Sequence, residues 1–161
     1  MPVTLQTVDQ ARWDACEQER VDLLRIYADA PEERMRVDSP ETFILQHLEA
    51  RHFFACARFN DRLLGAVAIE VAADGAWWLS QLCVHKSTRR RGVGSRLIAL
   101  MGELASEQGR VLRIATAALP LPDRILLSKL GYRPVSLPPP GDATAARHGE
   151  FVELNPQGKG E

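Results

Sequence analysis

The segment Arg89-Arg90-Arg91-Gly92-Val93-Gly94 joins an apolar stretch, Trp77-Trp78-Leu79-Ser80-Gln81-Leu82-Cys83-Val84, to an amphipathic helix that we expect over residues 92–107. Glycine lets a backbone approach a ligand closely because it has no Cβ. The first amides of a helix have no partners within the helix and can donate hydrogen bonds to phosphate oxygens. Three arginines add positive charge with a geometry suited to phosphate. The order strand, glycine-containing loop and helix therefore predicts a site for a cofactor that carries a pyrophosphate.

The spacing of this loop excludes two common phosphate-binding motifs. A kinase-type P-loop requires Lys-Ser or Lys-Thr directly after its second glycine, whereas Ser95-Arg96 follows here. A dinucleotide fingerprint requires a third glycine three residues further on, and that position is Leu97. The pattern that does fit is Arg-x-x-Gly-x-Gly over residues 89–94, preceded by Leu-x-Val over residues 82–84.

This combined pattern resembles the acyl-CoA-binding motif of the GCN5-related N-acetyltransferase (GNAT) superfamily, and Leu130-Gly131-Tyr132 after a short helix strengthens the resemblance. The similarity extends over residues 52–137. It implies an α/β (α+β) fold in which helices flank a mixed, mostly antiparallel central sheet. It also implies that acetyl-CoA or CoA binds with its pantetheine arm along the strand and its pyrophosphate over the loop. The residues so implied in cofactor binding are Leu82, Cys83, Val84, Arg89, Arg90, Arg91, Gly92, Val93, Gly94 and Ser95.

A narrower similarity is to the PanZ (PanM) family of GNAT-fold acetyl-CoA sensors. It is carried by residues 57–64 (ARFNDRLL), residues 88–94 (TRRRGVG) and, upstream, residues 22–27 (DLLRIY). Members of that family bind aspartate 1-decarboxylase, promote its self-cleavage to the pyruvoyl enzyme, and inhibit it when acetyl-CoA is plentiful. The resemblance implies that the turn holding Arg58 and Asn60 faces this partner. The present chain is longer before its first expected strand and has a proline-rich tail, which puts a different or additional partner in play.

Local patterns predict the secondary structure. Thr7-x-x-Gln10 has the spacing of a capping box that opens a helical region, and Ser39-Pro40-Glu41 marks the start of another helix. Asn60-Asp61 indicates a turn between two strands. The expected strands cover residues 53–59, 63–71, 77–84, 111–116, 132–137 and 151–154, the first three as an antiparallel meander and the fourth parallel to its neighbour; a short helix covers residues 122–130 and a loop residues 138–149.

Composition indicates one ordinary globular domain. The chain has 161 residues, 45% apolar and 25% charged, and we expect a single GNAT-like domain over residues 1–154 and a disordered tail over residues 155–161. The net charge of −1 argues against a general nucleic-acid-binding protein. Three cysteines without a C-x-x-C pair indicate neither a disulfide scaffold nor a metal site. No secretory signal and no apolar run of membrane-spanning length is evident, so we expect a cytoplasmic protein.

The residues needed for catalysis are the weak point of the resemblance. Acetyl transfer needs a base that takes the proton of the ammonium group and an acid that protonates the leaving thiolate. The superfamily usually supplies the acid from a tyrosine four residues before the glycine of its Leu-Gly-Phe/Tyr element, and that position is Leu127 here. The usual base is a glutamate on the strand before Leu-x-Val, where residues 77–81 hold no carboxylate. Glu70 and His85 are the nearby substitutes, although a solvated strand residue and a surface loop histidine are the simpler interpretations.

Three hypotheses therefore stand side by side. The first is an acetyl-CoA-binding regulatory protein that binds its ligand without turnover and signals to aspartate 1-decarboxylase. The second is an active N-acetyltransferase for an unidentified amine, which would reveal itself by amine-dependent release of CoA. The third is a nucleic-acid-binding module built on the arginine cluster, against which the lack of interleaved aromatic residues counts. The chain keeps the elements that would bind acetyl-CoA but lacks both the usual acid and the usual base. This combination favours the hypothesis of a regulatory protein.

Overall fold

The computed structural model describes residues 3–28, 39–72, 75–84, 92–115, 121–135 and 151–154 of the chain. The chain divides into two compact units. The first comprises Met1–Ile69 and Gln81–Leu100, and the second comprises Glu70–Ser80 and Met101–Glu161. The chain passes between the units within two strands and one helix, so that these three elements each contribute to both.

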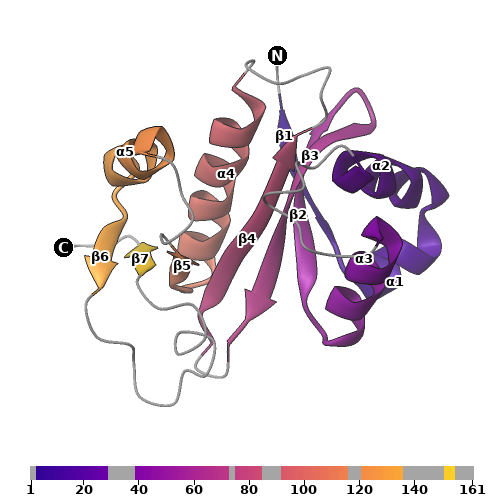
Figure 1. Ribbon diagram of the computed structural model, residues 1–161, viewed down its shortest axis with the longest axis horizontal. Helices are drawn as coiled ribbons and strands as arrows, with labels where there is room; N and C mark the ends of the chain where they lie inside the picture. The colour runs from indigo at the N-terminus through magenta and orange to yellow at the C-terminus, as the bar shows by residue number, and fades with distance from the viewer. Residues whose placement is uncertain are drawn as a thin grey trace. The chain divides into compact units, whose positions relative to one another are not determined.

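The elements follow one another as β1 (Thr4–Val8), α1 (Gln10–Ala15), α2 (Glu17–Ala28), α3 (Pro40–Glu49), β2 (Phe53–Phe59), β3 (Arg62–Val71), β4 (Trp77–Val84), α4 (Val93–Glu107), β5 (Leu112–Ala115), α5 (Leu121–Lys129), β6 (Arg133–Val135) and β7 (Phe151–Leu154) (Figure 1). Hydrogen bonding gives the strand order β1-β2-β3-β4-β5-β7-β6. The pairs β1–β2, β2–β3, β5–β7 and β6–β7 are antiparallel, whereas β4 and β5 are parallel. This confirms the expected α/β (α+β) class with a mixed, mostly antiparallel sheet and flanking helices.

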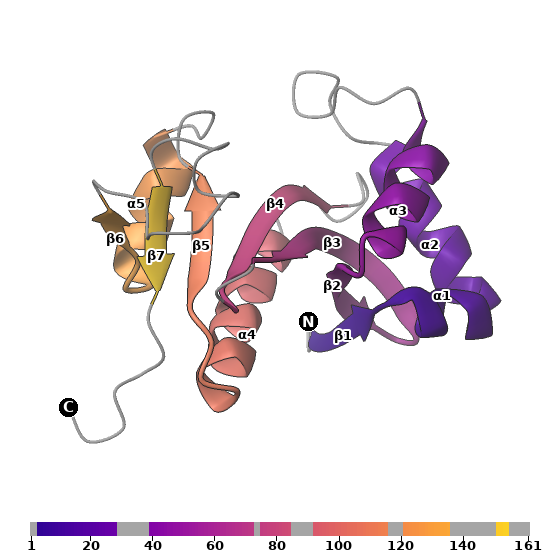
Figure 2. The ribbon, with the colours of Figure 1, turned by 90° about the horizontal axis from the view of Figure 1, so that it is seen from below.

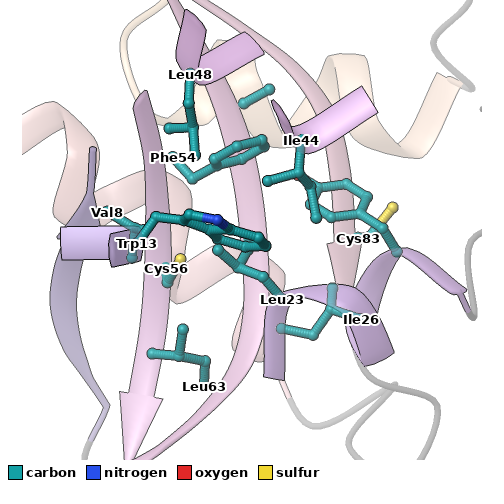
Figure 3. Packing of buried hydrophobic residues seen from close by; sticks show 13 residues of the cluster. Val8, Trp13, Leu23, Ile26, Ile44, Leu48, Phe54, Cys56, Leu63 and Cys83 are labelled. Carbon is teal, nitrogen blue, oxygen red and sulfur yellow. The ribbon is translucent and has the colours of Figure 1, made fainter. Parts of the chain in front are cut away.

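In the first unit, helices α1, α2 and α3 cover one face of strands β1, β2 and β3, as the two views agree (Figures 1 and 2). The apolar core on this face includes Val8, Trp13, Leu23, Ile26, Ile44, Leu48, Phe54, Cys56, Leu63 and Cys83 (Figure 3). Successive residues of a strand point to opposite faces, so Ala55 and Ala57, which are also buried, face away from these helices. A strand covered on both sides reads as a continuous apolar run, which explains the sequence of β2.

The start of the chain differs from the expectation. The Thr7-x-x-Gln10 pattern does not cap a helix, because residues 4–8 form β1 and pair with β2 from Thr4 opposite Arg58 to Val8 opposite Phe54. The helix begins only after this pairing ends, and Asp9 is its N-cap, accepting a hydrogen bond from the Arg12 N–H at 2.9 Å. Strand β1 was not expected because its partner strand β2 lies far along the chain, with Thr4 and Arg58 54 residues apart, and such pairing leaves no local signature.

The expected start of α3 is confirmed. Ser39 is the N-cap, and its hydroxyl accepts a hydrogen bond from the Thr42 N–H at 3.1 Å, while Pro40 occupies the first helical position. Pro fits there because its missing N–H would have no partner in the helix. The later elements agree with the expectation within two residues at each end, including the final strand at residues 151–154. The expected loop at residues 138–149 and the expected tail at residues 155–161 lie outside the described residues.

The second unit has a separate small core. Trp78 of β4 and Phe151 of β7 pack with ring centroids 4.9 Å apart. Arg113 of β5 is buried beside both rings, and its Nε donates to the Glu153 carboxylate at 3.2 Å. A buried arginine requires such a partner, since an unpaired charge away from water is strongly unfavourable.

No helix among the described residues is both long and apolar enough to cross a membrane.

Three helices end in the same way. After α4 and α5, Gly109 and Gly131 adopt left-handed backbone conformations, with φ of 67° and 101°. Each glycine N–H bonds back to the carbonyl three residues earlier, and the next N–H bonds five residues back, which is the Schellman arrangement. After α3 the same pair of bonds is made by Arg51 and His52, but Arg51 carries a Cβ at a φ of 68°.

We expect Arg51→Gly to stabilise the protein. Holding a residue with a Cβ in the left-handed region costs about 1–2 kcal/mol, and the extra entropy of glycine in the unfolded chain offsets about 0.5–1 kcal/mol of the relief. The net gain in the free energy of unfolding should therefore be about 0.5–1 kcal/mol, measured by urea denaturation. Arg51→Ala is the matched control and should show no gain, because alanine is strained in the same way. Equal midpoints for the two variants would contradict this reading.

Candidate functional site

The described residues that the sequence assigns to cofactor binding lie in the first unit, where the end of β4 meets the start of α4. Along β4, Cys83 faces the core shared with the helices α1 to α3, so Leu82 and Val84 face the opposite side. There they meet α4: a Cβ built on Gly94 would lie 3.5 Å from Val84 Cγ2 and 3.7 Å from Leu82 Cδ2. The first turn of α4 therefore rests directly on the two side chains of the Leu-x-Val pattern.

The start of α4 offers backbone donors beside this contact. The first hydrogen bond of the helix runs from the Arg96 N–H to the Gly92 carbonyl at 3.0 Å. The N–H groups of Val93, Gly94 and Ser95 precede this first helical donor and are the kind of group that binds an anion at a helix start. Gly92 has a φ of 78°, a conformation that favours glycine, although a Cβ there would meet no atom of the described residues within 4 Å. Its backbone conformation is thus the reason for glycine at this position.

Gly65 of β3 is part of the same structure and was not identified from the sequence. A Cβ on Gly65 would lie 3.3 Å from the carbonyl oxygen of Cys83, 3.3 Å from Val93 Cγ1 and 3.4 Å from Val84 Cγ2. Strand β3, the end of β4 and the first turn of α4 therefore come together at a position where a Cβ would make contacts closer than ordinary van der Waals contacts. The available signal was an isolated glycine within an apolar strand, which often marks a close approach of another segment.

The structure brings together part of the expected cofactor set. Residues 82–84 and 92–95 gather at the contact between β4 and α4, whereas Arg89, Arg90 and Arg91 lie outside the described residues, as does His85. Glu70 is half-buried near the end of β3 and belongs to the second unit.

The position of the usual catalytic acid carries no proton donor. Leu127, in α5, is buried in the second unit. The neighbouring Tyr132 is also buried, and its hydroxyl has no hydrogen-bond partner among the described residues. Burial raises the pKa of Tyr132 above its ordinary value. Among the described residues, no cluster of His, Cys, Asp and Glu is arranged to hold a metal ion.

The turn expected to face a partner is a tight hairpin between β2 and β3. Asn60 and Asp61 have φ of 50° and 63°, and the flanking residues Phe59 and Arg62 pair directly, which is the pattern of a type I′ turn. Arg58, one residue before this pair, donates from Nη1 to Gln6 Oε1 and from Nη2 to Asp61 Oδ1, both at 3.0 Å. The side chain of Asp61 is 91% exposed and that of Arg58 is 32% exposed. The turn therefore presents polar groups to the outside, and its arginine is hydrogen-bonded both to β1 and to the turn itself.

Two buried carboxylates lie beneath this turn. Glu19 of α2 accepts hydrogen bonds from Arg12 Nε at 2.7 Å and Nη2 at 2.6 Å, and its Oε2 lies 3.9 Å from Arg58 Nη1. Both Glu19 and Asp22 are nearly inaccessible to solvent, at 4% and 2% exposure. Glu19 did not stand out in the sequence, because a helix rich in charged residues predicts solvent exposure for each of them.

Asp22 is held by the strand that leaves the turn. Its carboxylate accepts hydrogen bonds from Arg62 Nε and Nη2, the shortest at 2.7 Å, from the Leu63 N–H at 3.0 Å and from Gln18 Nε2 at 3.0 Å. Burial alone would raise the pKa of Asp22, but these donors, with Arg62 first among them, hold the pKa below its ordinary value. The pKa of the Arg62 guanidinium is raised in turn by its hydrogen bond to Asp22.

Comparison of the sequence with known proteins shows which proteins this chain resembles. Residues 3–112 match a family model described as the acetyltransferase (GNAT) domain, PanZ. The PanD regulatory factor of Escherichia coli K12 is 36% identical over 83 residues, which are 51% of this chain and 55% of that protein. The chain spans about half the length of the curated relatives it matches.

Solved structures share the fold at low identity. The ribosomal-protein-S18-alanine N-acetyltransferase of Escherichia coli is 15% identical with a TM-score of 0.63, over 99% of this chain and 97% of that one. A Bacillus subtilis acetyltransferase in complex with CoA is 16% identical with a TM-score of 0.62, over 96% and 99% of the two chains. At these identities the likeness concerns the fold, and it confirms the expected GNAT fold.

We expect Gly65→Ala to destabilise the protein by about 1–3 kcal/mol, because the added methyl group would meet a backbone oxygen that cannot move without distorting β4. Gly94→Ala is the control, since its Cβ would make only ordinary contacts with Val84 and Leu82. Urea denaturation of both variants measures the difference. If Gly65→Ala were as stable as Gly94→Ala, the close approach at Gly65 would not exist in solution.

The stabilisation that the Asp22 carboxylate provides should depend on pH. Because the native pKa of Asp22 is below that of an unfolded aspartate, about 3.9, its ionised form stabilises the fold above about pH 4 and this stabilisation is lost as the pH falls through the native pKa. The difference in free energy of unfolding between the wild type and Asp22→Asn should therefore be largest near neutral pH and shrink below about pH 4. Asp61→Asn, which removes an exposed carboxylate, should change stability by at most about 1 kcal/mol. A difference that stays constant with pH would contradict the assignment.

Proposed function

Because this chain belongs to the PanZ family of GNAT acetyltransferase domains, we propose that it is an acetyl-CoA-binding regulatory protein that binds aspartate 1-decarboxylase and controls its maturation and activity. In this proposal residues 1–154 act as one GNAT-like domain in the cytoplasm. The observation that carries the ligand half of the proposal is the first turn of α4 resting on Leu82 and Val84 through Gly94.

The proposed ligand contacts follow from that geometry. The pantetheine arm, which alternates amide and methylene groups, would run along β4 at Leu82, Cys83 and Val84, where a strand backbone supplies donors and acceptors. The pyrophosphate would lie at the amides of Val93, Gly94 and Ser95, with Arg89, Arg90 and Arg91 adding positive charge. A helix start binds an anion through several N–H groups at once, so the site suits a diphosphate better than a single carboxylate.

Regulation without turnover is supported by the proton-handling positions. The position of the usual acid is Leu127, which is buried and cannot donate a proton. Glu70 and His85 remain the weak candidates for a base. A protein that keeps the ligand-binding elements and lacks the usual acid is better suited to report acetyl-CoA than to consume it.

The partner half of the proposal rests on the β2–β3 turn. The PanZ resemblance directs Arg58 and Asn60 toward aspartate 1-decarboxylase, and in the structure this turn is a tight hairpin with an exposed tip. Both the turn and the ligand contacts belong to the first unit, and the family match over residues 3–112 contains all of them.

A charge placed at the start of α4 tests the ligand site. Ser95 is exposed in the first helical turn, so Ser95→Glu should weaken acetyl-CoA binding by about tenfold or more through repulsion of the pyrophosphate, measured by calorimetry. The same substitution should leave the fold intact, because an acidic residue stabilises a helix start. Ser95→Gln has the same size without the charge and should bind normally. Equal affinities for the two variants would exclude the pyrophosphate from this position.

The partner is tested by titrating the chain into aspartate 1-decarboxylase from the same organism, with and without acetyl-CoA. Binding that requires or is strengthened by acetyl-CoA is the expected result, since ligand and partner affinities are then linked. Absence of binding in both conditions would refute the regulatory role. The alternative, an active N-acetyltransferase, would then predict amine-dependent release of CoA that is lost in Glu70→Gln or His85→Ala.

A further inference from the structure

We propose that the buried carboxylates of Glu19 and Asp22 are positioning residues of the β2–β3 turn, which fix from beneath the direction in which Arg58 and Asn60 face a protein partner. This inference rests on the proposed role of the turn in binding aspartate 1-decarboxylase. It adds two residues that make no contact with the partner themselves, since both are almost wholly buried.

The two acids reach the two sides of the turn from one face of one helix. They are three residues apart on α2 and so lie on the same side of it. Glu19 lies against Arg58, in the strand that enters the turn, and also binds Arg12 of α1. Asp22 binds Arg62 and the N–H of Leu63, in the strand that leaves the turn. One turn of α2 thus holds the hairpin at both strands within two residues of its tip.

Buried charge makes this anchoring selective for one arrangement. An apolar contact tolerates a small slide of one surface over another, whereas a buried carboxylate that loses its donors is left unpaired at high cost. Asp22 has four donor groups around it, and a shift of the hairpin would remove several of them together. The hairpin is therefore restricted to the position in which the carboxylates of Glu19 and Asp22 keep their hydrogen-bond donors.

The restricted position of the hairpin also fixes the direction of the Arg58 side chain at the surface. Its guanidinium is shared between Gln6 of β1 and Asp61 of the turn, with Glu19 behind it. A long arginine side chain normally loses rotamer freedom when it binds, and that loss weakens the complex. Here the freedom is already lost in the unbound protein, so the arginine is presented in a fixed direction.

The test removes the charge of each acid while keeping its shape, in the full-length chain. Glu19→Gln and Asp22→Asn should each weaken binding to aspartate 1-decarboxylase by about tenfold at saturating acetyl-CoA, while the dissociation constant for acetyl-CoA itself stays within about twofold of the wild type. Glu41→Gln removes an exposed carboxylate from α3 with the same change in net charge, and should alter neither affinity. Asp22→Glu restores the charge and should recover part of the partner affinity.

A second readout reports the turn without the partner. Amide hydrogen exchange at Leu63 should quicken in Asp22→Asn, and the Nε–Hε resonance of Arg12 should shift in Glu19→Gln, because these groups donate to the two carboxylates. Normal acetyl-CoA affinity identifies the variants that have folded; if Asp22→Asn does not fold, Glu19→Gln, whose partners are side chains only, decides the matter.

The outcomes separate the two proposals. If the wild type fails to bind aspartate 1-decarboxylase, the proposed function is refuted and this inference falls with it. If the wild type binds and the folded variants bind equally well, the positioning role alone is refuted. If Leu63 exchange quickens while partner affinity stays unchanged, the acids hold the hairpin without serving recognition, and the inference is again refuted. Weaker partner binding with normal acetyl-CoA affinity supports it.

Discussion

The close approach of β3, β4 and α4 at Gly65 is the constraint on which the first unit depends. Val93, at the start of α4, and Val84, at the end of β4, both lie within 3.4 Å of the space that a Cβ on Gly65 would occupy. A side chain there would press against both valines and against the carbonyl oxygen of Cys83. The absence of one lets the first turn of α4 pack onto Leu82 and Val84, and this contact fixes where the amides that have no partner within the helix point.

Much of this arrangement could be predicted from the sequence, because its signals are local. An apolar stretch, two glycines at fixed spacing and an amphipathic helix indicate a strand, a turn and a helix in order, and the structure has β4 and α4 there. Ser39-Pro40 caps α3 for the same reason, since the cap bonds only to residues that follow it directly. The parallel pairing of β4 and β5 follows from the helix between them.

The remaining features depend on contacts between distant segments. Thr7 lies in a strand and does not cap a helix because it pairs with Ala55 of β2, and the residues near Thr7 in the sequence do not indicate this pairing. Glu19 is buried because Arg12 and Arg58 approach it from α1 and β2, and a single helical sequence carries no sign of either. Arg51 takes the place of a glycine after α3 because the bonds of the helix end outweigh the strain at one residue. Tertiary structure decides each of these positions.

Strand β3 connects the β2–β3 turn with the start of α4 over a short distance. The N–H of Leu63 donates to Asp22 on the side of the turn, and Gly65, two residues later, lies against Val93 at the start of α4. Between these two contacts the register of β2 and β3 shifts, since Ala57 lies opposite Gly65 and Arg58 lies opposite Leu63. An anion bound at the start of α4 would act on a helix start that packs against Gly65, two residues from the Leu63 N–H that Asp22 holds. By linkage, a partner that prefers one position of the turn would equally favour one state of the helix start, so that ligand and partner affinities change together in both directions.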